Sequence, residues 1–311
     1  KIENKAFEEF LDTSDEWIKE RTGINSRHVA TEETVLSLGA TAAKNALEMA
    51  GIDSSSLEII ICTTATPDNI YPNMACLIQA ELGNKTAICY DVNAACSGFL
   101  YGAMMAKAYI ESGMAKTVMV VSSEITTKTI DYSDRGSCIL FGDGAGAVMV
   151  EKCEDGGIIS FVQHSDGSRG HVLSCSSRQL NNPYHKEEAK NNFVQMDGRE
   201  VFAFAVRQVP MAINEALMKV NLTPQDVDIF VLHQANRRII EGISKRLMLD
   251  ISGEDAKRFP MNLERVGNTS SAAIPLLLDE LNRSGQLKEG QTIVLSGFGA
   301  GLTYGACVMK W

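Results

Sequence analysis

The sequence contains no apolar run close to the roughly 20 residues that a membrane-spanning helix requires, and no secretory signal opens it. It has eight cysteines but no C-x-x-C pair, which disfavours a disulfide framework and a zinc site. The net charge of −10 disfavours broad binding to nucleic acid or to anionic membranes. We therefore expect a cytoplasmic protein with reduced thiols, no nucleic-acid partner and no membrane partner.

Several catalytic and cofactor motifs are also missing. There is no G-x-S-x-G for a serine hydrolase and no H-E-x-x-H, and the histidines are scattered, so we expect no metal. The glycine clusters at 142–146 and 297–301 lack G-x-G-x-x-G spacing and lead into strand-like sequence, whereas a phosphate loop must lead into a helix. We interpret both clusters as tight turns that bring bare backbone close to another group.

Apolar stretches of strand length alternate with helical stretches along the sequence. Strands are expected at 57–64, 85–92, 118–122, 145–151, 227–232, 292–296 and 303–310. Helices are expected at 35–50, 73–82, 97–112, 200–220, 235–248 and 271–283. This alternation predicts a layered α/β fold with largely parallel, buried strands.

The two halves of the sequence follow one pattern. Each contains a long helix, an acidic turn, a continuous apolar strand and a glycine-rich turn that leads into a closing strand. We infer a duplication with a boundary near residue 155. Residues 165–198 are polar and irregular, which predicts a loop excursion of the kind that carries substrate contacts.

Three residues form a candidate catalytic set. Cys96 follows an apolar strand and precedes a helix, whose dipole favours the thiolate. His233 ends a second apolar strand, and Asn268 lies in a glycine-flanked loop just before a helix that Thr269 or Ser270 would cap. Taken singly, each has a structural interpretation: a buried thiol, a core histidine, a turn asparagine. Taken together, a neutral amide beside a histidine can hold a thioester carbonyl and stabilise an enolate.

Eight motifs resemble the β-ketoacyl-acyl-carrier-protein synthase III family, the initiating condensing enzymes of type II fatty-acid synthesis in the thiolase-like superfamily. In order along the chain they are Asp12-Thr-Ser-Asp-Glu-Trp-Ile, Arg21-Thr-Gly-Ile, Ala94-Ala-Cys-Ser-Gly-Phe, Asp134-Arg-Gly, Phe141-Gly-Asp-Gly-Ala-Gly-Ala, His233-Gln-Ala-Asn, Gly267-Asn-Thr-Ser and Gly297-Phe-Gly-Ala-Gly-Leu-Thr. The resemblance implies a homodimer with a five-layered αβαβα fold of two similar halves, 1–155 and 156–311. It also implies a first strand ahead of these motifs, which this sequence does not contain.

The resemblance implies an acyltransferase that carries out a decarboxylative Claisen condensation. Cys96 would take a starter acyl group from acyl-CoA, releasing CoA. His233 and Asn268 would then act on malonyl-acyl-carrier protein, whose decarboxylation supplies the carbanion that attacks the acyl-cysteine. The backbone N–H groups of Cys96 and Ala300 would form the oxyanion hole. The products would be a 3-oxoacyl-carrier protein and CO2, with no cofactor beyond the thioester substrates.

The resemblance also assigns substrate contacts. The residues implied for CoA are Thr13, Trp17, Arg21, Arg135, Gly198 and Asn236, with Trp17 and Arg135 stacking on the adenine. Those implied for the acyl pocket are Tyr71, Phe141 and Phe298, the tyrosine being lent by the partner subunit. A basic cluster of Arg237, Arg238, Lys245 and Arg246, on a chain of net negative charge, would dock the acidic carrier protein.

Alternatives share the same reactive residues. A priming ketosynthase of a polyketide or quinolone pathway retains these motifs, and hydroxymethylglutaryl-CoA synthase and chalcone synthase are more remote. A non-catalytic ketosynthase-like partner belongs to another class, and the presence of Cys96 argues against it. The starter acyl group stays open, because one methylene in a pocket changes binding by only about 1–3 kcal/mol.

Overall fold

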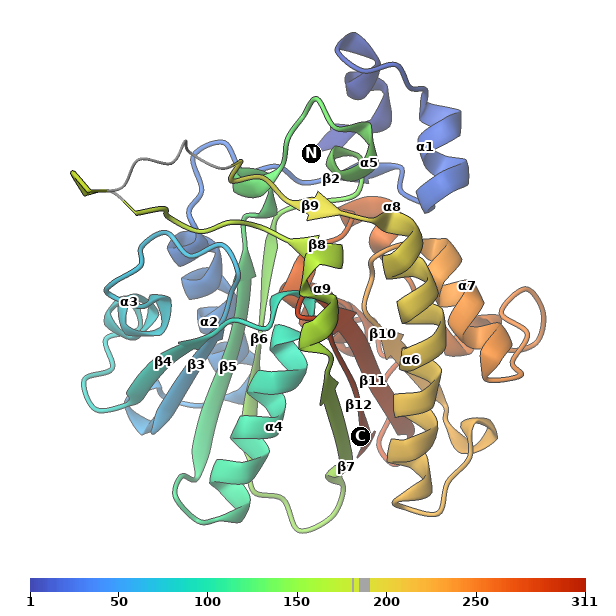
Figure 1. Cartoon of the computed structure of the whole chain (residues 1–311). Coiled ribbons are helices and arrows are strands. Elements are labelled where there is room, and N and C mark those ends of the chain that lie inside the picture. The colour runs from blue at the N-terminus through green and yellow to red at the C-terminus, as the bar shows by residue number, and fades with distance from the viewer. Residues whose placement is uncertain (181, 185–190) are drawn as a thin grey trace.

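The computed structural model describes residues 1–180, 182–184 and 191–311 (Figure 1). Part of the predicted excursion, including His185, therefore lies outside the described residues. Two four-stranded sheets stand side by side, one from each half of the chain. Two short ribbons accompany them, β1 (Ile2–Glu3) with β2 (Ser26–Arg27) and β8 (Leu173–Ser174) with β9 (Gln195–Met196).

The first sheet has the strand order β4-β3-β5-β6. Its strands are β3 (Ile59–Thr63), β4 (Ile88–Val92), β5 (Thr117–Glu124) and β6 (Gly144–Glu151). Strands β4, β3 and β5 are parallel, and β6 runs antiparallel to β5. All four match strands expected from the sequence.

The second sheet has the order β10-β11-β12-β7. Its strands are β7 (Gly157–Ser165), β10 (Ile229–Leu232), β11 (Thr292–Gly299) and β12 (Thr303–Lys310). Only β10 and β11 are parallel, and β12 is antiparallel to both of its neighbours. Two expectations are therefore wrong: the sheets are mixed rather than largely parallel, and β7 was not expected.

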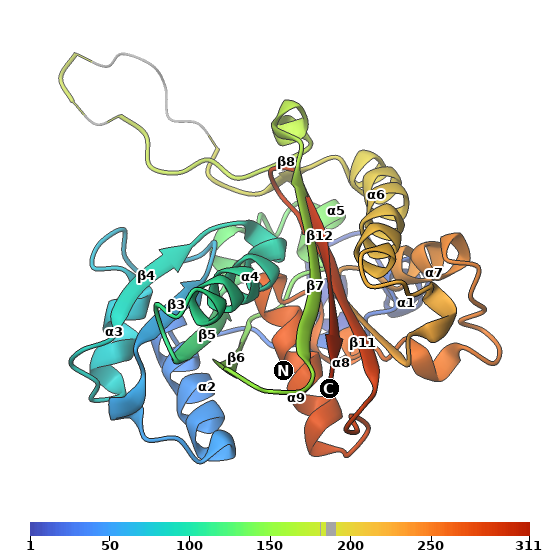
Figure 2. The ribbon, with the colours of Figure 1, turned by 90° about the horizontal axis from the view of Figure 1, so that it is seen from below.

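Helices separate and cover the sheets, as the view from below shows (Figure 2). Helices α2 and α3 pack on the outer face of the first sheet, α4 and α9 lie between the sheets, and α6 covers the second sheet with α7 against it. The helix bounds are α1 (Asp15–Thr22), α2 (Val35–Ala50), α3 (Met74–Glu81), α4 (Gly98–Glu111), α5 (Arg135–Cys138), α6 (Gly198–Met218), α7 (Arg237–Arg246), α8 (Leu263–Val266) and α9 (Ala273–Arg283). The expected layered α/β fold is confirmed.

Alternation along the strands explains why both sheet faces are buried. In β5, Val118 and Val120 face the central core between the sheets, while Met119 and Val121 face the core under α2 and α3. In β10, Val231 faces the central core, whereas Phe230 and Leu232 face the core under α6 and α7. A strand that buries both faces is apolar at nearly every position, so it is recognisable in sequence.

Helix α4 sits close to the first sheet because two of its residues lack side chains. A Cβ at Gly102 would lie 2.7 Å from Val120 and 2.9 Å from Thr63, and a Cβ at Gly98 would lie 3.1 Å from Thr63 and from Ser271. This close packing fixes the start of α4, and with it the turn that precedes it.

Within the described residues, no helix is both long and apolar enough to cross a membrane.

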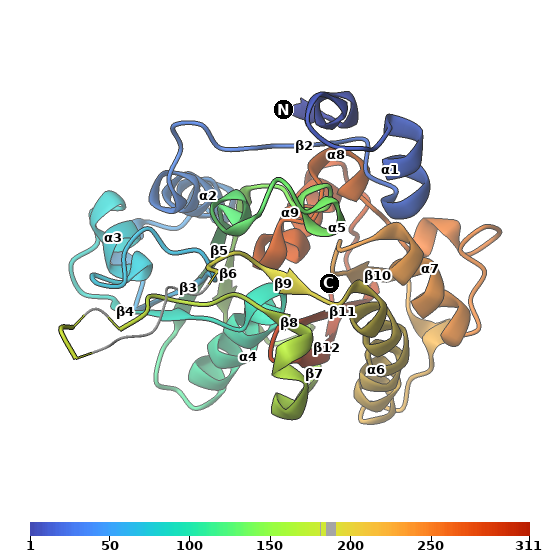
Figure 3. The same cartoon turned by 45° about the horizontal axis from the view of Figure 1, so that its top comes forward.

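The N-terminal segment and the short elements α5, β8 and β9 gather over one end of the two sheets (Figure 3). A small aromatic and aliphatic core holds part of this cap, with Phe7, Ile18 and Ile139 buried in it. The Gly23 turn at the end of α1 lies against α7, since a Cβ there would be 2.6 Å from that of Arg237. The cap therefore stands beside the strand ends that carry the candidate residues.

Candidate active site

The structure brings the three predicted reactive residues to one cavity. Cys96 lies in the one-turn helix η3 (Ala95–Ser97) between β4 and α4, His233 directly follows β10, and Asn268 lies between α8 and the short helix η8 (Ser270–Ala272). All three line a cavity of about 340 Å³. The two halves of the chain thus each contribute to one site.

The backbone around Cys96 is tightly held. Ala95 has a φ of 45°, in the left-handed region that residues other than glycine rarely adopt. The glycine turn after β11 lies against it, since a Cβ at Gly299 would be 2.8 Å from the Cys96 nitrogen and 2.9 Å from the Ser97 nitrogen. The prediction that this turn brings bare backbone close to another group is confirmed. Gly299 lines the cavity, and the predicted oxyanion donor Ala300 follows it.

Burial, rather than the helix dipole, dominates the protonation of Cys96. The side chain is 9% exposed, and burial raises the pKa of the thiol to about 12, against hydrogen bonds from Ser270 and from its own backbone that lower it. The helix dipole, which is expected to favour the thiolate, is therefore outweighed by burial. At neutral pH the thiol is protonated and needs a group that accepts its proton.

His233 is neutral for the same reason. It is 3% exposed, and burial lowers the pKa of its imidazole to about 4. Its backbone N–H donates to the Ser296 carbonyl at 2.8 Å, and the Phe298 ring meets the imidazole edge-to-face with centroids 5.5 Å apart. The buried Nδ1 has no partner in the described structure. Gly297 gives the imidazole room, because a Cβ there would lie 3.1 Å from the His233 Cβ.

Asn268 is positioned through its backbone and its amide oxygen. Its N–H donates to the Leu140 carbonyl at 2.8 Å, and its carbonyl accepts from Gly142 N–H at 3.0 Å, in a bridge that also pairs it with Phe141. The side-chain Oδ1 accepts from the Ser270 N–H at 3.0 Å. Since the oxygen is already engaged, the amide nitrogen is the atom left to donate to a ligand.

Cationic and aromatic groups surround the mouth of the cavity. Trp17 lines it, with the Arg135 guanidinium 4.6 Å and the Arg21 guanidinium 5.6 Å from its ring centroid. Gly198 and Asn236 line it as well, and Asn236 also caps α7 by accepting from the Arg238 N–H at 2.8 Å. Thr13 is not among the lining residues.

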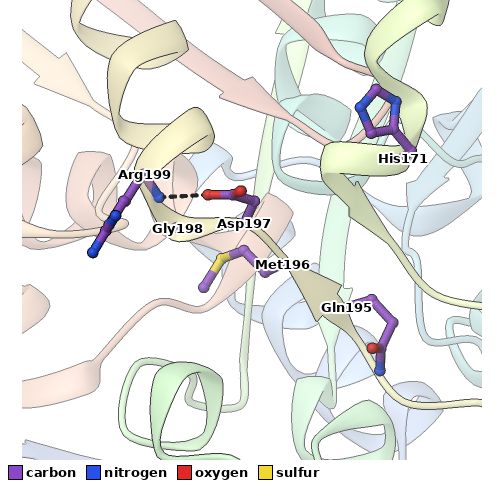
Figure 4. A pocket seen from close by; sticks show the side chains of 6 residues that line it. All are labelled: His171, Gln195, Met196, Asp197, Gly198 and Arg199. Carbon is purple, nitrogen blue, oxygen red and sulfur yellow. Dashed lines mark hydrogen bonds between the residues drawn. The ribbon is translucent and has the colours of Figure 1, made fainter.

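A second, open pocket adjoins this mouth at the start of α6 (Figure 4). Its lining includes His171 and Gln195 on one side and Arg199 on the other. Asp197 caps α6 there by accepting from the Arg199 N–H at 3.0 Å. Met196 and Gly198 line both pockets, so the excursion between β7 and α6 contributes directly to the cavity rim.

The other predicted residues lie in two different environments. Phe141 and Phe298 line the cavity, whereas Tyr71 is 84% exposed and does not line the cavity of its own chain. The basic residues expected to dock a carrier protein are all exposed on α7: Arg237, Arg238, Lys245 and Arg246. Of these, Arg237 forms an ion pair with Glu241 at 2.9 Å.

Sequence reasoning missed part of the cavity wall and a polar network behind it. Residues Ile139, Leu140, Leu173, Met196, Val201 and Phe202 also line the cavity. Behind Cys96, the buried carboxylate of Glu124 accepts a hydrogen bond from Ser270 at 3.0 Å. The glutamate that ends β5, just after the apolar run Val118-Met-Val-Val, was the available signal, because a charge so close to a buried strand must itself be buried or mark the strand end.

Comparison with known proteins identifies the family. Residues 90–167 match the family model for 3-oxoacyl-[acyl-carrier-protein] synthase III, and residues 217–311 match the model for its C-terminal part. A β-ketoacyl-[acyl-carrier-protein] synthase III from Clostridium perfringens is 43% identical over 311 residues, which cover 99% of this chain and 94% of that protein.

Solved structures agree with this assignment. The 3-oxoacyl-[acyl-carrier-protein] synthase III from Aquifex aeolicus superposes with a TM-score of 0.93 and 37% identity, covering 100% of this chain and 95% of that one. The priming β-ketosynthase of the R1128 polyketide pathway superposes with a TM-score of 0.90 and 37% identity, covering 99% and 91%. This chain therefore belongs to the 3-oxoacyl-[acyl-carrier-protein] synthase III family of thiolase-like condensing enzymes, which are acyltransferases.

Proposed function

We propose that this chain condenses a starter acyl-CoA with malonyl-acyl-carrier protein, giving a 3-oxoacyl-acyl-carrier protein, CO2 and CoA and so initiating fatty-acid synthesis. The observation that carries the proposal is the single cavity that Cys96, His233 and Asn268 share with Trp17 and Arg135. This cavity contains a nucleophile and two neutral polar groups, and its mouth is formed by an aromatic ring and a guanidinium group.

In the first half-reaction, the Cys96 sulfur attacks the acyl-CoA thioester and CoA leaves. The tetrahedral intermediate carries an oxyanion, for which the N–H groups of Cys96 and Ala300 are the proposed donors. The close approach of Gly299 to Cys96 supports this pairing, because it brings the turn that contains Ala300 next to the cysteine backbone. Each such donor typically contributes about 3 kcal/mol of transition-state stabilisation.

In the second half-reaction, His233 and Asn268 hold the thioester carbonyl of the malonyl group. A neutral imidazole and a neutral amide both donate hydrogen bonds to an enolate oxygen without requiring a counter-charge. The pKa of His233, about 4, keeps it uncharged at neutral pH. A desolvated site without a positive charge also disfavours the malonyl carboxylate relative to CO2, which drives decarboxylation. The resulting carbanion attacks the acyl-Cys96 thioester.

The mouth suits CoA. The adenine would insert between the Trp17 indole and the Arg135 guanidinium, whose carbon lies 4.6 Å from the indole ring centroid. Arg21 and Thr13 would contact the nucleotide, and Gly198 and Asn236 the pantetheine arm. Phe141 and Phe298 would line the acyl pocket.

The carrier protein would dock on α7. Its exposed basic residues stand out on a chain of net charge −10, and the helix follows His233 directly, so a carrier bound there delivers its arm to the cavity. Arg238 is the first choice for the dominant contact, because Arg237 is engaged by Glu241.

A homodimer would complete the acyl pocket. Strand β4 is an edge strand of the first sheet, and Ile88 on it is 62% exposed, while Tyr71 nearby in sequence is 84% exposed. An exposed, apolar edge strand favours pairing with a second copy. In such a pair each Tyr71 would reach the partner's acyl pocket.

The eight free cysteines suit the reducing cytoplasm.

A priming ketosynthase of a polyketide pathway is the second candidate. The similarity to the R1128 enzyme, at 37% identity, supports this second candidate, whereas the similarity to the Clostridium perfringens synthase III, at 43% identity, supports the first. The two functions use the same chemistry and differ in the starter acyl group and in the carrier protein.

One experiment tests the chemistry and separates the candidates. The protein and its Cys96→Ala variant are incubated with a panel of acyl-CoAs, without malonyl-carrier protein, and weighed by intact mass spectrometry. We expect an acyl adduct on the wild type and none on Cys96→Ala, and the preferred acyl mass identifies the starter. Absence of any adduct on folded wild-type protein would contradict the proposal.

A further inference from the structure

A fully buried carboxylate joins the two halves of the chain beside the candidate site. Glu124, the last residue of β5, has no exposed surface. One of its oxygens accepts hydrogen bonds from the loop after β3: from Thr66 Oγ1 at 2.8 Å, the Ala65 N–H at 3.0 Å and Thr64 Oγ1 at 3.3 Å. Within the described residues, Glu124 takes part in no salt bridge. A buried carboxyl group that only neutral donors hold is costly to keep, which points to a role beyond stability.

The other oxygen of Glu124 binds the short helix that follows Asn268. It accepts from Ser270 Oγ at 3.0 Å and from Ser271 Oγ at 2.7 Å, at the start of η8. Both serines are buried. Ser270 has a φ of 53°, in the left-handed region that serine rarely adopts. The bond from its hydroxyl to Glu124 therefore helps to hold Ser270 in a conformation that its own backbone disfavours.

Ser270 in turn holds the side chain of Asn268. Its backbone N–H donates to Asn268 Oδ1 at 3.0 Å, and within the described residues this is the only hydrogen bond that the Asn268 side chain makes. The other two anchors of Asn268, to Leu140 and to Gly142, are made by its backbone. Since the amide oxygen is engaged by Ser270, the amide nitrogen is left to donate to a ligand in the cavity that Asn268 lines.

We propose that Glu124 is a positioning residue for decarboxylation, which acts through Ser270 on the Asn268 amide. This role rests on the proposed function, in which Asn268 donates to the enolate oxygen of the malonyl group. Glu124 holds Ser270, and the Ser270 N–H sets the orientation of the amide, so that its nitrogen donates where negative charge develops. A donor that is fixed beforehand stabilises a transition state without reorganisation, whereas a donor that rotates freely must first be ordered.

The donors around Glu124 explain why a carboxylate occupies this position. They approach both oxygens, from the loop after β3 and from η8, and a carboxylate accepts on both. A glutamine of the same size would present an NH2 group on one side. The Ala65 N–H cannot accept, so this NH2 group would face Ser270 and Ser271, whose hydroxyls can accept as well as donate. Glu124→Gln should therefore keep most of the arrangement, whereas Glu124→Ala should lose it.

Two neighbouring serines provide a matched test. Ser270→Ala and Ser271→Ala each remove one hydroxyl bonded to the same oxygen of Glu124, but only Ser270 also bonds the Asn268 side chain. Release of CO2 from saturating malonyl-carrier protein measures decarboxylation, and intact mass measures acylation of Cys96 by an acyl-CoA. We expect Ser270→Ala and Glu124→Ala to slow decarboxylation between about 10- and 100-fold and to change acylation little. Ser271→Ala should stay close to wild type, and Glu124→Gln should recover most of the rate that Glu124→Ala loses.

A double-mutant cycle separates positioning from a general loosening of the fold. In the Asn268→Ala background the amide is absent, so Ser270→Ala should slow decarboxylation no further. A loss of activity through a loosened fold would instead add to the effect of Asn268→Ala. Equal slowing by Ser270→Ala in both backgrounds would therefore overturn the inference, and so would equal decarboxylation rates in the two serine variants.

Failure of the proposed function would give a different result. If wild-type protein releases no CO2 from malonyl-carrier protein, the proposed function fails, and crystal structures of the two serine variants still test the positioning. We expect the Asn268 amide to be displaced in Ser270→Ala and unmoved in Ser271→Ala, and an unmoved amide in both would overturn the inference. Should Glu124→Ala fail to fold, the serine pair decides alone.

Discussion

The two ends of the cavity differ in charge and in exposure. At the inner end, burial keeps both reactive side chains uncharged, since it raises the pKa of Cys96 to about 12 and lowers that of His233 to about 4. At the mouth, the guanidinium groups of Arg21 and Arg135 lie over Trp17 and are exposed to solvent. Desolvation therefore penalises charged groups at the inner end, whereas water can still solvate the charged groups at the mouth.

This difference suits a substrate that has a highly charged end and a neutral thioester end. In the proposed function, the phosphates of CoA would remain at the hydrated, cationic mouth, and only the thioester would enter the inner end. There the neutral donors would stabilise the oxyanion and the enolate of the proposed reaction. Neutrality at the inner end and cationic stacking at the mouth should then affect different steps of the reaction.

The largest effects are expected from the neutral donors. His233→Ala and Asn268→Ala should each slow decarboxylation of malonyl-carrier protein by about 10²–10³-fold, because each removes one hydrogen bond to the enolate oxygen. Acylation of Cys96 should change much less, since it precedes that step. Release of CO2 measures the first quantity and intact mass the second.

Asn268→Asp sharpens this test. The substitution keeps the size of the side chain but adds a negative charge beside the malonyl carboxylate. We expect decarboxylation to be at least as slow as in Asn268→Ala. Activity close to wild type in Asn268→Asp would show that neutrality at the inner end is unimportant.

Burial of neutral His233 should also make stability depend on pH. Its pKa is about 4 in the folded chain and near 6.5 when unfolded, so between these values the unfolded state binds a proton that the folded state does not. Stability is therefore lost as pH falls through this window, by about 2 kcal/mol at about pH 5 and about 3 kcal/mol at full extent.

The measurement is denaturant unfolding of wild type and His233→Asn at about pH 7.5 and about pH 5. The variant lacks the titrating group, so its stability relative to wild type should improve on acidification by about 2 kcal/mol. A difference that does not change with pH would mean that His233 is not buried in the neutral form.

Much of the fold could be predicted from sequence because its strands are buried on both faces. β7 escaped because Gly157-Ile-Ile-Ser-Phe-Val-Gln-His mixes polar and apolar residues after a glycine pair. Its place in the sheet depends on pairing with β12, where His164 meets Tyr304. Such long-range pairing leaves little trace in the local sequence.

The candidate site likewise has a part that the sequence could predict and a part that it could not. Cys96, His233 and Asn268 could be selected from their motifs, because each motif is local. The protonation of Cys96 could not, since it depends on how deeply the folded chain buries the thiol. The buried contact of Glu124 could not either, because its partner Ser270 lies 146 residues further along the chain.

A smaller effect is expected at the mouth, where two variants of Trp17 isolate the stacking. Trp17→Ala removes one face of the proposed adenine site, and a stacked base typically contributes about 1–3 kcal/mol, so KM for acyl-CoA should rise about tenfold or more. Because the inner end is untouched, kcat and the reaction with malonyl-carrier protein should change little. Trp17→Phe keeps an aromatic face and should restore most of the affinity.

Arg238→Ala tests binding of the other substrate, the malonyl-carrier protein, and so serves as a control for Trp17→Ala. Arg238 lies on α7 outside the cavity lining, so KM for acyl-CoA should stay as in wild type. KM for the malonyl-carrier protein should rise by about threefold, and this difference should shrink in high salt, because exposed charges are screened. If both variants raised both KM values equally, the mouth and the α7 surface would not be separate binding regions. If Trp17→Ala raised only the KM for acyl-CoA and Arg238→Ala only the KM for the carrier protein, the two substrates would reach the same inner end by different surfaces.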